Sequence, residues 1–395
     1  MTVKDRTAGG PLAGIRVLDI SIMAAGPWTG ALLGMLGAEV IKVEPPAGDG
    51  TRWVMPTQRG MGTNYIAMNV NKKGVVLDFK TPQGREDGLR LLAFCDVFVQ
   101  NFRVGVIERL RLDYESVRAI NPRLVYCAIS GFGETGPLAK AGCADPIMQA
   151  FSGFARANGA PGDALDAFRF TGFLDLATAS VATEAILAAL LDREVSGEGQ
   201  KIEVSMLEAA LEIQHTRIAE LLGAGLVPSA RGSESPGFAP DGAYRAQDQE
   251  IFLTVHTQAE WNGFCAAIEK PELAADARFA TNRERVGRRA ELNALIASVI
   301  KLRPAFWWLR ILQRNGVASG LAYNFETFRH HAQVVENGMI ARLATPAWGE
   351  VSVGGTPWHF SGTPCEVRVP TQPGEYTDEV LSGLAAPART GESAA

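Results

Sequence analysis

A long apolar segment of the sequence carries two isolated acidic side chains. Residues 170–191 contain Asp175 and Glu184 as their only charged residues. A carboxylate in so apolar a helix is costly to bury unless a partner satisfies it. Asp175 falls in the first turn of the predicted helix, where the helix dipole stabilises a negative charge. This placement keeps a carboxylate ionised at neutral pH, as a carboxylate nucleophile requires. The pattern leaves two roles open, a stabilised helix start and a nucleophile.

A glycine loop with the spacing Gly-x-Gly-x-x-Gly follows a predicted strand at residues 124–130. Its glycines are Gly131, Gly133 and Gly136. The spacing is typical of a dinucleotide-binding turn, but its surroundings do not fit, because Pro137 comes next and no strand ending in an acidic residue lies about twenty positions on. The sequence therefore predicts a flexible loop beside a ligand or a plain turn, and it disfavours a nicotinamide or flavin cofactor.

The histidines and cysteines have no spacing that is typical of a metal site. The five histidines form no His-x-x-x-His pair, and the five cysteines form no Cys-x-x-Cys pair. Neither a Gly-x-Ser-x-Gly elbow nor a Walker A loop occurs. We therefore expect no metal, no disulfide framework and a reducing compartment.

The composition excludes several classes of protein. The chain has 395 residues, of which 47% are hydrophobic and 21% charged, and its formal net charge is −5. This apolar content supports a large folded core. A net negative charge argues against a protein that coats nucleic acid, although a few local cations suffice to bind an anionic small molecule. The start Met-Thr-Val-Lys-Asp-Arg-Thr-Ala-Gly-Gly-Pro contains no apolar signal region, so we expect a cytoplasmic protein.

One uncharged stretch, residues 20–38, raises the question of a membrane. It spaces Gly26, Gly30 and Gly34 four residues apart. The Gly26–Pro27 step divides it into a strand end and a helix of roughly ten residues, which is too short to cross a bilayer. The stretch predicts a buried helix whose glycine face admits another backbone or a flat ligand, and we expect no membrane partner.

Strands and helices alternate along the first 130 residues, which predicts an α/β fold with a mostly parallel, Rossmann-like sheet covered on both faces. The sequence then becomes helical, apart from a strand at 201–205. A stretch rich in Pro, Gly and Ser at 227–240 predicts a linker to a second unit. The predicted strands of the first part are residues 14–20, 38–44, 75–80, 96–102 and 124–130. We expect a large domain in 1–222, a small domain with linkers in 223–330, and a return to the large domain with a disordered tail in 331–395.

Several long motifs occur in a fixed order along the chain. Together they resemble the class III CoA-transferases, the family of formyl-CoA transferase, carnitine CoA-transferase and α-methylacyl-CoA racemase. The resemblance runs from about residue 10 to residue 365. The motifs are residues 11–19, 25–27, 36–45, 71–73, 77–80, 101–103, 121–126, 130–133, 196–200 and 280–283.

The resemblance implies a large α/β domain with a smaller α+β domain, and an interlocked dimer in which each subunit threads through the other. It aligns Asp175 with the family's catalytic aspartate. It implies no permanently bound cofactor, with a coenzyme A thioester and a carboxylic acid as substrates. The glycine loops offer oxyanion candidates at Gly131, Gly133, Gly136 and Gly232. The implied coenzyme A contacts are Met23, Ala24, Ala25, Leu77, Lys80, Asn101, Phe102, Arg109 and Met206.

Three departures from the family's pattern narrow the expected activity. Pro45 stands where some members have a basic residue. Residues 231–237 replace the tetraglycine loop of the oxalate-using branch, which argues against oxalate as acceptor. Ala144 stands where racemase-type members have a histidine before Asp145, which disfavours a racemase. The sequence favours transfer of coenzyme A, with succinyl-CoA as a candidate donor. An intramolecular CoA-shuttling isomerase, and a non-catalytic subunit that pairs with a paralogue, stay open.

Overall fold

Six parallel strands form the central sheet of the computed structural model, which describes residues 9–162 and 172–384. The order is β5–β2–β1–β6–β7–β8, and each neighbouring pair is parallel. Most strand residues are buried, as expected when helices cover both faces of a parallel sheet. The predicted α/β fold with a mostly parallel sheet is confirmed. The strands are β1 (Arg16–Asp19), β2 (Glu39–Glu44), β5 (Lys72–Val76), β6 (Val97–Gln100), β7 (Val125–Ser130) and β8 (Lys201–Ser205).

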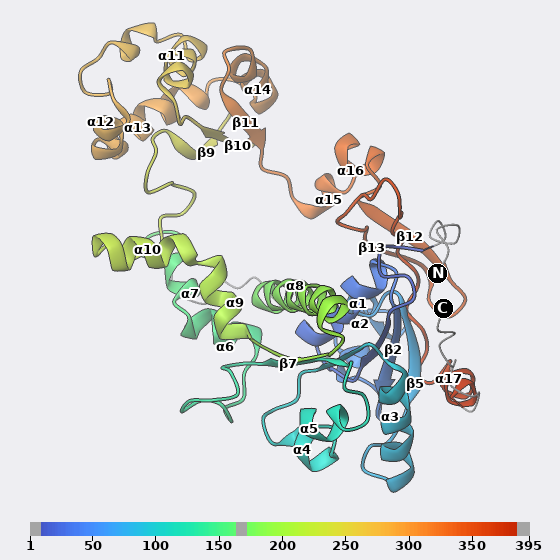
Figure 1. Cartoon of the computed structure of the whole chain (residues 1–395). Helices are drawn as coiled ribbons and strands as arrows, with labels where there is room; N and C mark the ends of the chain where they lie inside the picture. The colour runs from blue at the N-terminus through green and yellow to red at the C-terminus, as the bar shows by residue number, and fades with distance from the viewer. Residues whose placement is uncertain (1–8, 163–171, 385–395) are drawn as a thin grey trace. The chain divides into compact units, whose positions relative to one another are not determined.

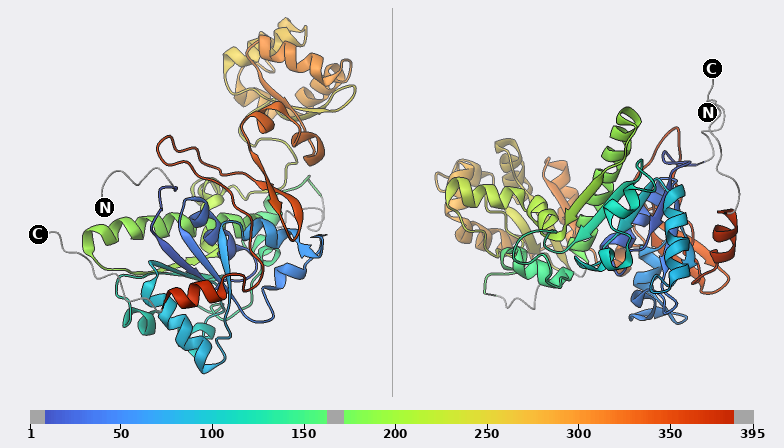
Figure 2. Two further views of the ribbon diagram at one scale, coloured as in Figure 1. Left: turned by 90° about the vertical axis from the view of Figure 1, so that its right-hand side faces the viewer. Right: turned by 60° about the horizontal axis from the view of Figure 1, so that its bottom comes forward.

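Two layers of helices cover the sheet (Figure 1). On one face, α1 (Ala25–Met35) and α8 (Phe173–Ser196) pack together over an apolar cluster that includes Leu33 and Ile186. The other face is covered by α3 (Pro82–Phe94), α4 (Val106–Leu110), α5 (Tyr114–Arg118) and α17 (Thr377–Gly383). The left view of Figure 2 shows α8 in green on one side of the sheet, with α3 in cyan and α17 in red on the other.

The glycine face of α1 admits polar neighbours at close range. A Cβ atom added at Gly30 would lie 2.6 Å from Asp19 Oδ2, and one added at Gly34 would lie 2.9 Å from the Asn71 carbonyl oxygen. The buried helix predicted from the uncharged stretch is present, and its glycines are required by this packing. Among the described residues, one helix, α8, is long and apolar enough to span a membrane, and it packs on the sheet.

One strand end is corrected by the structure. Residues 77–80, predicted as the end of a strand, form the turn into α3 instead. Asp78 Oδ1 accepts the Lys80 N–H at 3.0 Å, and Thr81 Oγ1 accepts the Gly84 N–H at 3.0 Å. These short-range hydrogen bonds compete with strand pairing and start the helix.

The chain divides into two compact units. The first contains the central sheet, residues 172–225 and the described residues from 332 onwards. Its remaining elements are η2 (Gly50–Trp53), β3 (Thr57–Gln58), β4 (Met61–Gly62), α2 (Thr63–Met68), α6 (Asp145–Phe151), α9 (Met206–Ile213), α10 (His215–Ala224), α16 (Ala332–Glu336) and the hairpin of β12 (Ile340–Thr345) and β13 (Gly349–Gly354). Residues 385–395 of the predicted tail lie outside the described part of the chain.

The second unit contains residues 226–331 and the described residues 155–162, which include all of α7 (Phe154–Ala157) except its first residue. It has its own core around Trp261 and Phe264. Its antiparallel sheet has the order β11–β10–β9. The elements are β9 (Asp241–Arg245), β10 (Glu250–Thr254), α11 (Gln258–Ala267), η4 (Pro271–Ala274), α12 (Asn282–Gly287), α13 (Arg289–Ile300), α14 (Ala305–Arg314), β11 (Ala318–Leu321) and α15 (Phe325–Phe328).

Candidate active site

The central sheet has a topological switch point between β1 and β6. The chain continues from β1 to β2 on one side and from β6 to β7 on the other. In open α/β sheets the loops at the carboxyl ends of such strands diverge and leave a crevice for a ligand. The loop 20–24 follows β1, and the loop 101–105 follows β6. Five of the predicted coenzyme A contacts lie on these loops or at the start of α1, namely Met23, Ala24, Ala25, Asn101 and Phe102.

The Asn101 side chain ties the two loops together. Its Oδ1 accepts the Ile22 N–H at 2.8 Å, and its Nδ2 donates to the Ile22 carbonyl oxygen at 2.7 Å. Met23, the next residue, has a φ of 69°, which is uncommon outside glycine, and its N–H lies 3.3 Å from Asp49 Oδ2. Asn101 and Asp49 therefore fix the backbone of the loop from two sides, while the Met23 side chain is exposed.

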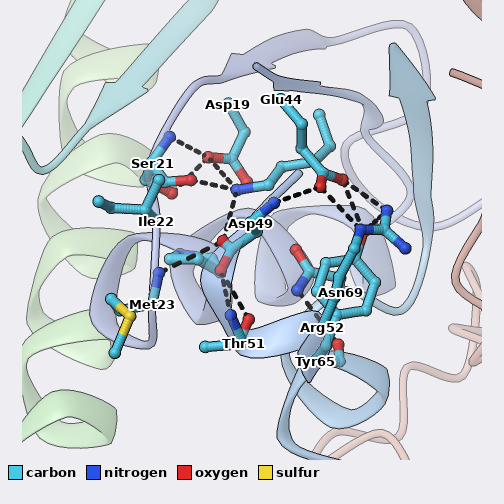
Figure 3. A network of polar contacts seen from close by, with 12 residues as sticks. Asp19, Ser21, Ile22, Met23, Glu44, Asp49, Thr51, Arg52, Tyr65 and Asn69 are labelled. Atoms are coloured by element: carbon cyan, nitrogen blue, oxygen red, sulfur yellow. Dashed lines mark hydrogen bonds and ion pairs between the residues drawn. The ribbon is translucent and has the colours of Figure 1, made fainter. Parts of the chain in front are cut away.

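A buried network of charges lies beneath this loop (Figure 3). Lys72 Nζ lies 2.9 Å from Asp19 Oδ2, and Arg52 Nη2 lies 2.6 Å from Glu44 Oε1. Burial of unpaired charges would be very costly, but here opposite charges balance in number. The network contains three carboxylates and three cations, all buried: Asp19, Glu44, Asp49, Lys42, Arg52 and Lys72.

The pKa shifts in the network follow from burial and pairing. Burial lowers the pKa of Lys72 to about 8, although the Asp19 carboxylate acts in the opposite direction. Burial also tends to raise the pKa of Asp19, but Lys42 and Lys72 hold it below its usual value. This network is not among the features predicted from the sequence. The signal was two charges, Lys42 and Glu44, that interrupt the apolar residues of the strand after Glu39.

Asp175 lies in the first turn of α8, half-buried, where that helix meets the start of α1. The Ala25 N–H, at the first position of α1, donates to its carboxylate and favours the charged form. Burial and the charge of Asp145 act more strongly and raise the pKa of Asp175 to about 6. From the sequence, the helix dipole is expected to favour the ionised form of Asp175. The net shift is in the opposite direction, yet the carboxylate is mostly ionised at pH 7.

Asp145 supplies the cap that α8 lacks. Gly172 precedes the helix and offers no side-chain acceptor. The buried Asp145 Oδ2 instead accepts the N–H groups of Leu174 at 2.7 Å and Asp175 at 3.2 Å, and its Oδ1 accepts from the Gln149 amide. From the sequence, this aspartate is assigned no role beyond its place in the racemase pattern. The missed signal was a long helix without an N-cap residue of its own.

The remaining predicted coenzyme A contacts lie in three different settings. Met206 is buried and packs in one cluster with Leu174, below the start of α8. Leu77 is buried in the apolar core of the α3 face. Lys80 and Arg109 are exposed, and Arg109 Nη1 donates to the Gly105 carbonyl oxygen at 2.6 Å. Of these four, Met206 is therefore the one that the structure places in a cluster with the neighbour of Asp175.

The predicted oxyanion glycines have structural roles within their own loops. A Cβ atom at Gly131 would lie 2.3 Å from Cys143 Cβ, so this position must be glycine. Gly133 and Gly136 have φ values of 95° and 87°, and the Gly133 N–H donates to Ser130 Oγ at 3.0 Å. Gly232 belongs to the second unit, and its N–H donates within that unit to the carbonyl oxygen of Gly159 at 2.7 Å. The Ala25 N–H is the donor that faces Asp175.

No group of three potential ligands for a metal ion occurs in residues 9–162 and 172–384. The arrangement at Asp175 joins a partly buried carboxylate and a backbone donor at the start of α1, next to the loop 20–24. A carboxylate in such a place can act as a nucleophile toward an acyl group.

Comparisons with known proteins assign the chain to a family. The sequence model described as CoA-transferase family III matches residues 12–375. The succinyl-CoA:glutarate CoA-transferase of Mus musculus is 32% identical over 375 residues, which cover 94% of this chain and 86% of that protein. The acetyl-CoA:oxalate CoA-transferase of Acetobacter aceti is 32% identical over 354 residues, which cover 89% and 90%.

A solved structure gives the same result for the fold. The crystal structure of a CAIB/BAIF family protein from Brucella suis matches with a TM-score of 0.84 and 32% sequence identity. The match covers 95% of this chain and 100% of that one.

Proposed function

We propose, since the chain belongs to CoA-transferase family III, that it moves coenzyme A from an acyl-CoA to a carboxylic acid through covalent intermediates on Asp175. The observation that carries the proposal is the position of the Asp175 carboxylate. It is half-buried beside the loop 20–24, and the Ala25 N–H donates to it. A nucleophile needs this combination of access, partial desolvation and fixed orientation.

The proposed reaction begins with two exchanges. An Asp175 carboxylate oxygen attacks the carbonyl of the donor thioester, the C–S bond breaks, and an aspartyl–acyl anhydride and CoA thiolate result. The thiolate then attacks the aspartyl carbonyl carbon and displaces the donor acid as its carboxylate. The enzyme now holds an aspartyl-CoA thioester. The acceptor carboxylate repeats both exchanges in reverse order, which yields acceptor-CoA and regenerates the Asp175 carboxylate.

The residues around Asp175 support these steps. When a thiolate attacks the aspartyl carbonyl, negative charge develops on the carboxyl oxygen that the Ala25 N–H already faces, and the start of α1 stabilises that charge. The apolar side chains of Leu174, Met148 and Met206 form one cluster directly below. These apolar side chains limit the approach of water, which would otherwise hydrolyse the anhydride.

For the substrates we propose succinyl-CoA as donor and a dicarboxylic acid of similar size as acceptor. The support is the similarity to succinyl-CoA:glutarate CoA-transferase from Mus musculus and to succinate–glutarate CoA-transferase from Agrobacterium fabrum, which is 33% identical over 389 residues. Ala144 before Asp145 leaves no imidazole at this position for a racemase, so transfer is favoured over racemisation.

The test is a screen of the purified protein with succinyl-CoA and a panel of mono- and dicarboxylates, in which new CoA esters are identified by mass. We expect succinate release and glutaryl-CoA formation, with no oxalyl-CoA. If no acid accepts coenzyme A from succinyl-CoA or acetyl-CoA, the proposed activity is wrong. A single diacid CoA thioester that changes its own attachment point, without any acceptor, would indicate the isomerase.

We also propose that two chains form an interlocked dimer in the cytoplasm. The support is a set of large apolar side chains that a lone subunit leaves in water, which is typical of an interface. These are Leu191 and Val195 of α8, Leu222 of α10, and Leu226 and Val227 after it, each more than 60% exposed. Light scattering is expected to give twice the mass of the chain. A monomer at micromolar concentration contradicts this proposal.

Replacing Asn101 with alanine should weaken acyl-CoA binding more than turnover. The change removes both hydrogen bonds to Ile22 and releases the loop 20–24. Two such bonds correspond to about a 10- to 100-fold rise in KM for the acyl-CoA. Asn121→Ala is the matched control, because Asn121 binds the carbonyl oxygens of Leu92 and Cys95 on the other face of the sheet. Equal KM values for both variants and the wild type would show that Asn101 has no such role.

A further inference from the structure

The carboxylate of Asp145 lies behind the proposed nucleophile. We propose that Asp145 is a positioning residue for Asp175: it fixes the first turn of α8 through two backbone N–H groups and places its carboxylate beside that of Asp175, so that coenzyme A is held on the enzyme as the aspartyl thioester. This inference rests on the proposed function, because it assigns a role to Asp145 in that same reaction.

The hydrogen bonds that Asp145 accepts support its role in positioning Asp175. Asp145 Oδ2 takes the N–H groups of Leu174 and Asp175, at 2.7 and 3.2 Å. These are two of the free donors at the start of α8, to which an aspartate in the first turn often folds back. With both occupied, the Asp175 carboxylate is directed to the Ala25 N–H of the adjacent helix instead. Asp145 itself is buried and cannot rotate into water.

The charges around Asp175 support the proposed effect of Asp145 on the basicity of that carboxylate. The groups that face it within the described residues are Asp145 from α6, the Cys143 thiol from the preceding segment, and the Ala25 N–H from α1. Asp145 carries a negative charge, and its capping bonds consume the positive end of α8 that would otherwise stabilise an Asp175 anion. Burial and this repulsion both favour the protonated form of Asp175.

Greater basicity has a defined chemical result. In the first half-reaction, Asp175 and the donor acid compete for the CoA group: the thiolate attacks the aspartyl carbonyl and expels the donor carboxylate, or attacks the donor carbonyl and expels Asp175. The less basic carboxylate is the better leaving group. The balance therefore moves toward aspartyl-CoA plus free acid, by up to about tenfold for each unit by which the Asp175 pKa exceeds that of the acid. As a result, more of the hydrolysable anhydride is converted to the aspartyl-CoA thioester.

The variant Asp145→Asn separates charge from capping. The asparagine Oδ1 can still accept from Leu174 and Asp175, and its amide can donate to a reoriented Gln149. We expect the acidic midpoint of kcat/KM for succinyl-CoA to fall by about one pH unit. Incubated with succinyl-CoA alone, the variant should also carry several-fold less CoA adduct at pH 7.5 than the wild type, as measured by intact-protein mass.

Two further variants make the result decisive. Asp145→Ser is a second neutral replacement that keeps an oxygen acceptor, and the same shift is expected if the asparagine variant does not fold. Asp113→Asn is the control, because Asp113 caps α5 through the Ser116 N–H at 3.1 Å and should leave the midpoint unchanged. Identical midpoints and adduct fractions in the wild type and a folded Asp145 variant overturn the inference. A wild type that forms no adduct at Asp175 refutes the proposed function instead.

Discussion

Asp175→Asn is expected to lower kcat for CoA transfer by at least about 10⁴-fold, because an amide cannot form the anhydride on which both half-reactions depend. The asparagine side chain has the same shape and can still accept from the Ala25 N–H, so binding of acyl-CoA should persist. The measurement is steady-state transfer from succinyl-CoA, followed by mass. In the wild type, hydroxylamine added during turnover should leave a hydroxamate at Asp175, and in the variant it should leave none.

Glu184→Gln is the matched control for this variant. Glu184 is the other charge of the apolar stretch, and it is exposed on the same helix. Its neutralisation should leave kcat unchanged. Retention of more than a few per cent of activity by Asp175→Asn would exclude Asp175 as the nucleophile, and the function would have to be assigned to other residues.

The wild-type pH profile follows from the pKa of Asp175. Burial and the nearby Asp145 raise that pKa to about 6 from 3.8, so kcat/KM should rise with pH through about 6 and level off above 7. The folded state holds this proton more tightly than the unfolded state. Its contribution to stability is therefore complete below pH 3.8 and is lost as the pH rises through about 6. At pH 7 Asp175→Asn removes the buried charge, and its thermal midpoint should be equal or higher.

The sheet could be predicted from the sequence because its signals are local. Apolar strand runs and the turn residues between them each lie within a few residues, and strands that alternate with helices favour a parallel sheet. The partners of a buried charge are not local. Asp19, Lys42 and Lys72 lie on β1, β2 and β5, and the sheet order is what places them together.

The site was predictable to the same degree. Asp175 stands out in the sequence as an isolated charge in an apolar helix, and the family resemblance is what proposes it as the nucleophile. The carboxylate that caps that helix is thirty residues earlier in the chain, and no periodic pattern connects the two. The expectation that Asp175 is ionised at pH 7 agrees with its pKa of about 6. The dipole argument behind that expectation, however, requires free N–H groups, and Asp145 occupies two of them. The sequence pattern does not show which residues of distant segments come into contact in the folded chain.

Lys72→Met is expected to lower the free energy of unfolding by about 3–5 kcal/mol. The methionine fills a similar volume, but three acceptors lose their donor: Asp19 Oδ2 at 2.9 Å, the Pro27 carbonyl oxygen at 2.6 Å and Asn69 Oδ1 at 2.9 Å. Asp19 is then a buried carboxylate whose nearest cation, Lys42, lies 3.9 Å away. Urea unfolding followed by circular dichroism gives the comparison.

The neighbouring Lys73 provides the control for this prediction. Lys73 Nζ lies 2.9 Å from Glu39 and 3.0 Å from Glu379, and all three side chains are partly exposed. Exposed ion pairs of this kind contribute little to stability, so Lys73→Met should lower the free energy of unfolding by less than about 1 kcal/mol. The double variant Lys72→Met with Asp19→Asn should be more stable than the sum of its single changes predicts, because it removes both buried charges together. If the losses in free energy of unfolding are additive, or if Lys72→Met and Lys73→Met have equal effects, the buried pair of Lys72 and Asp19 does not stabilise the structure beneath the loop 20–24.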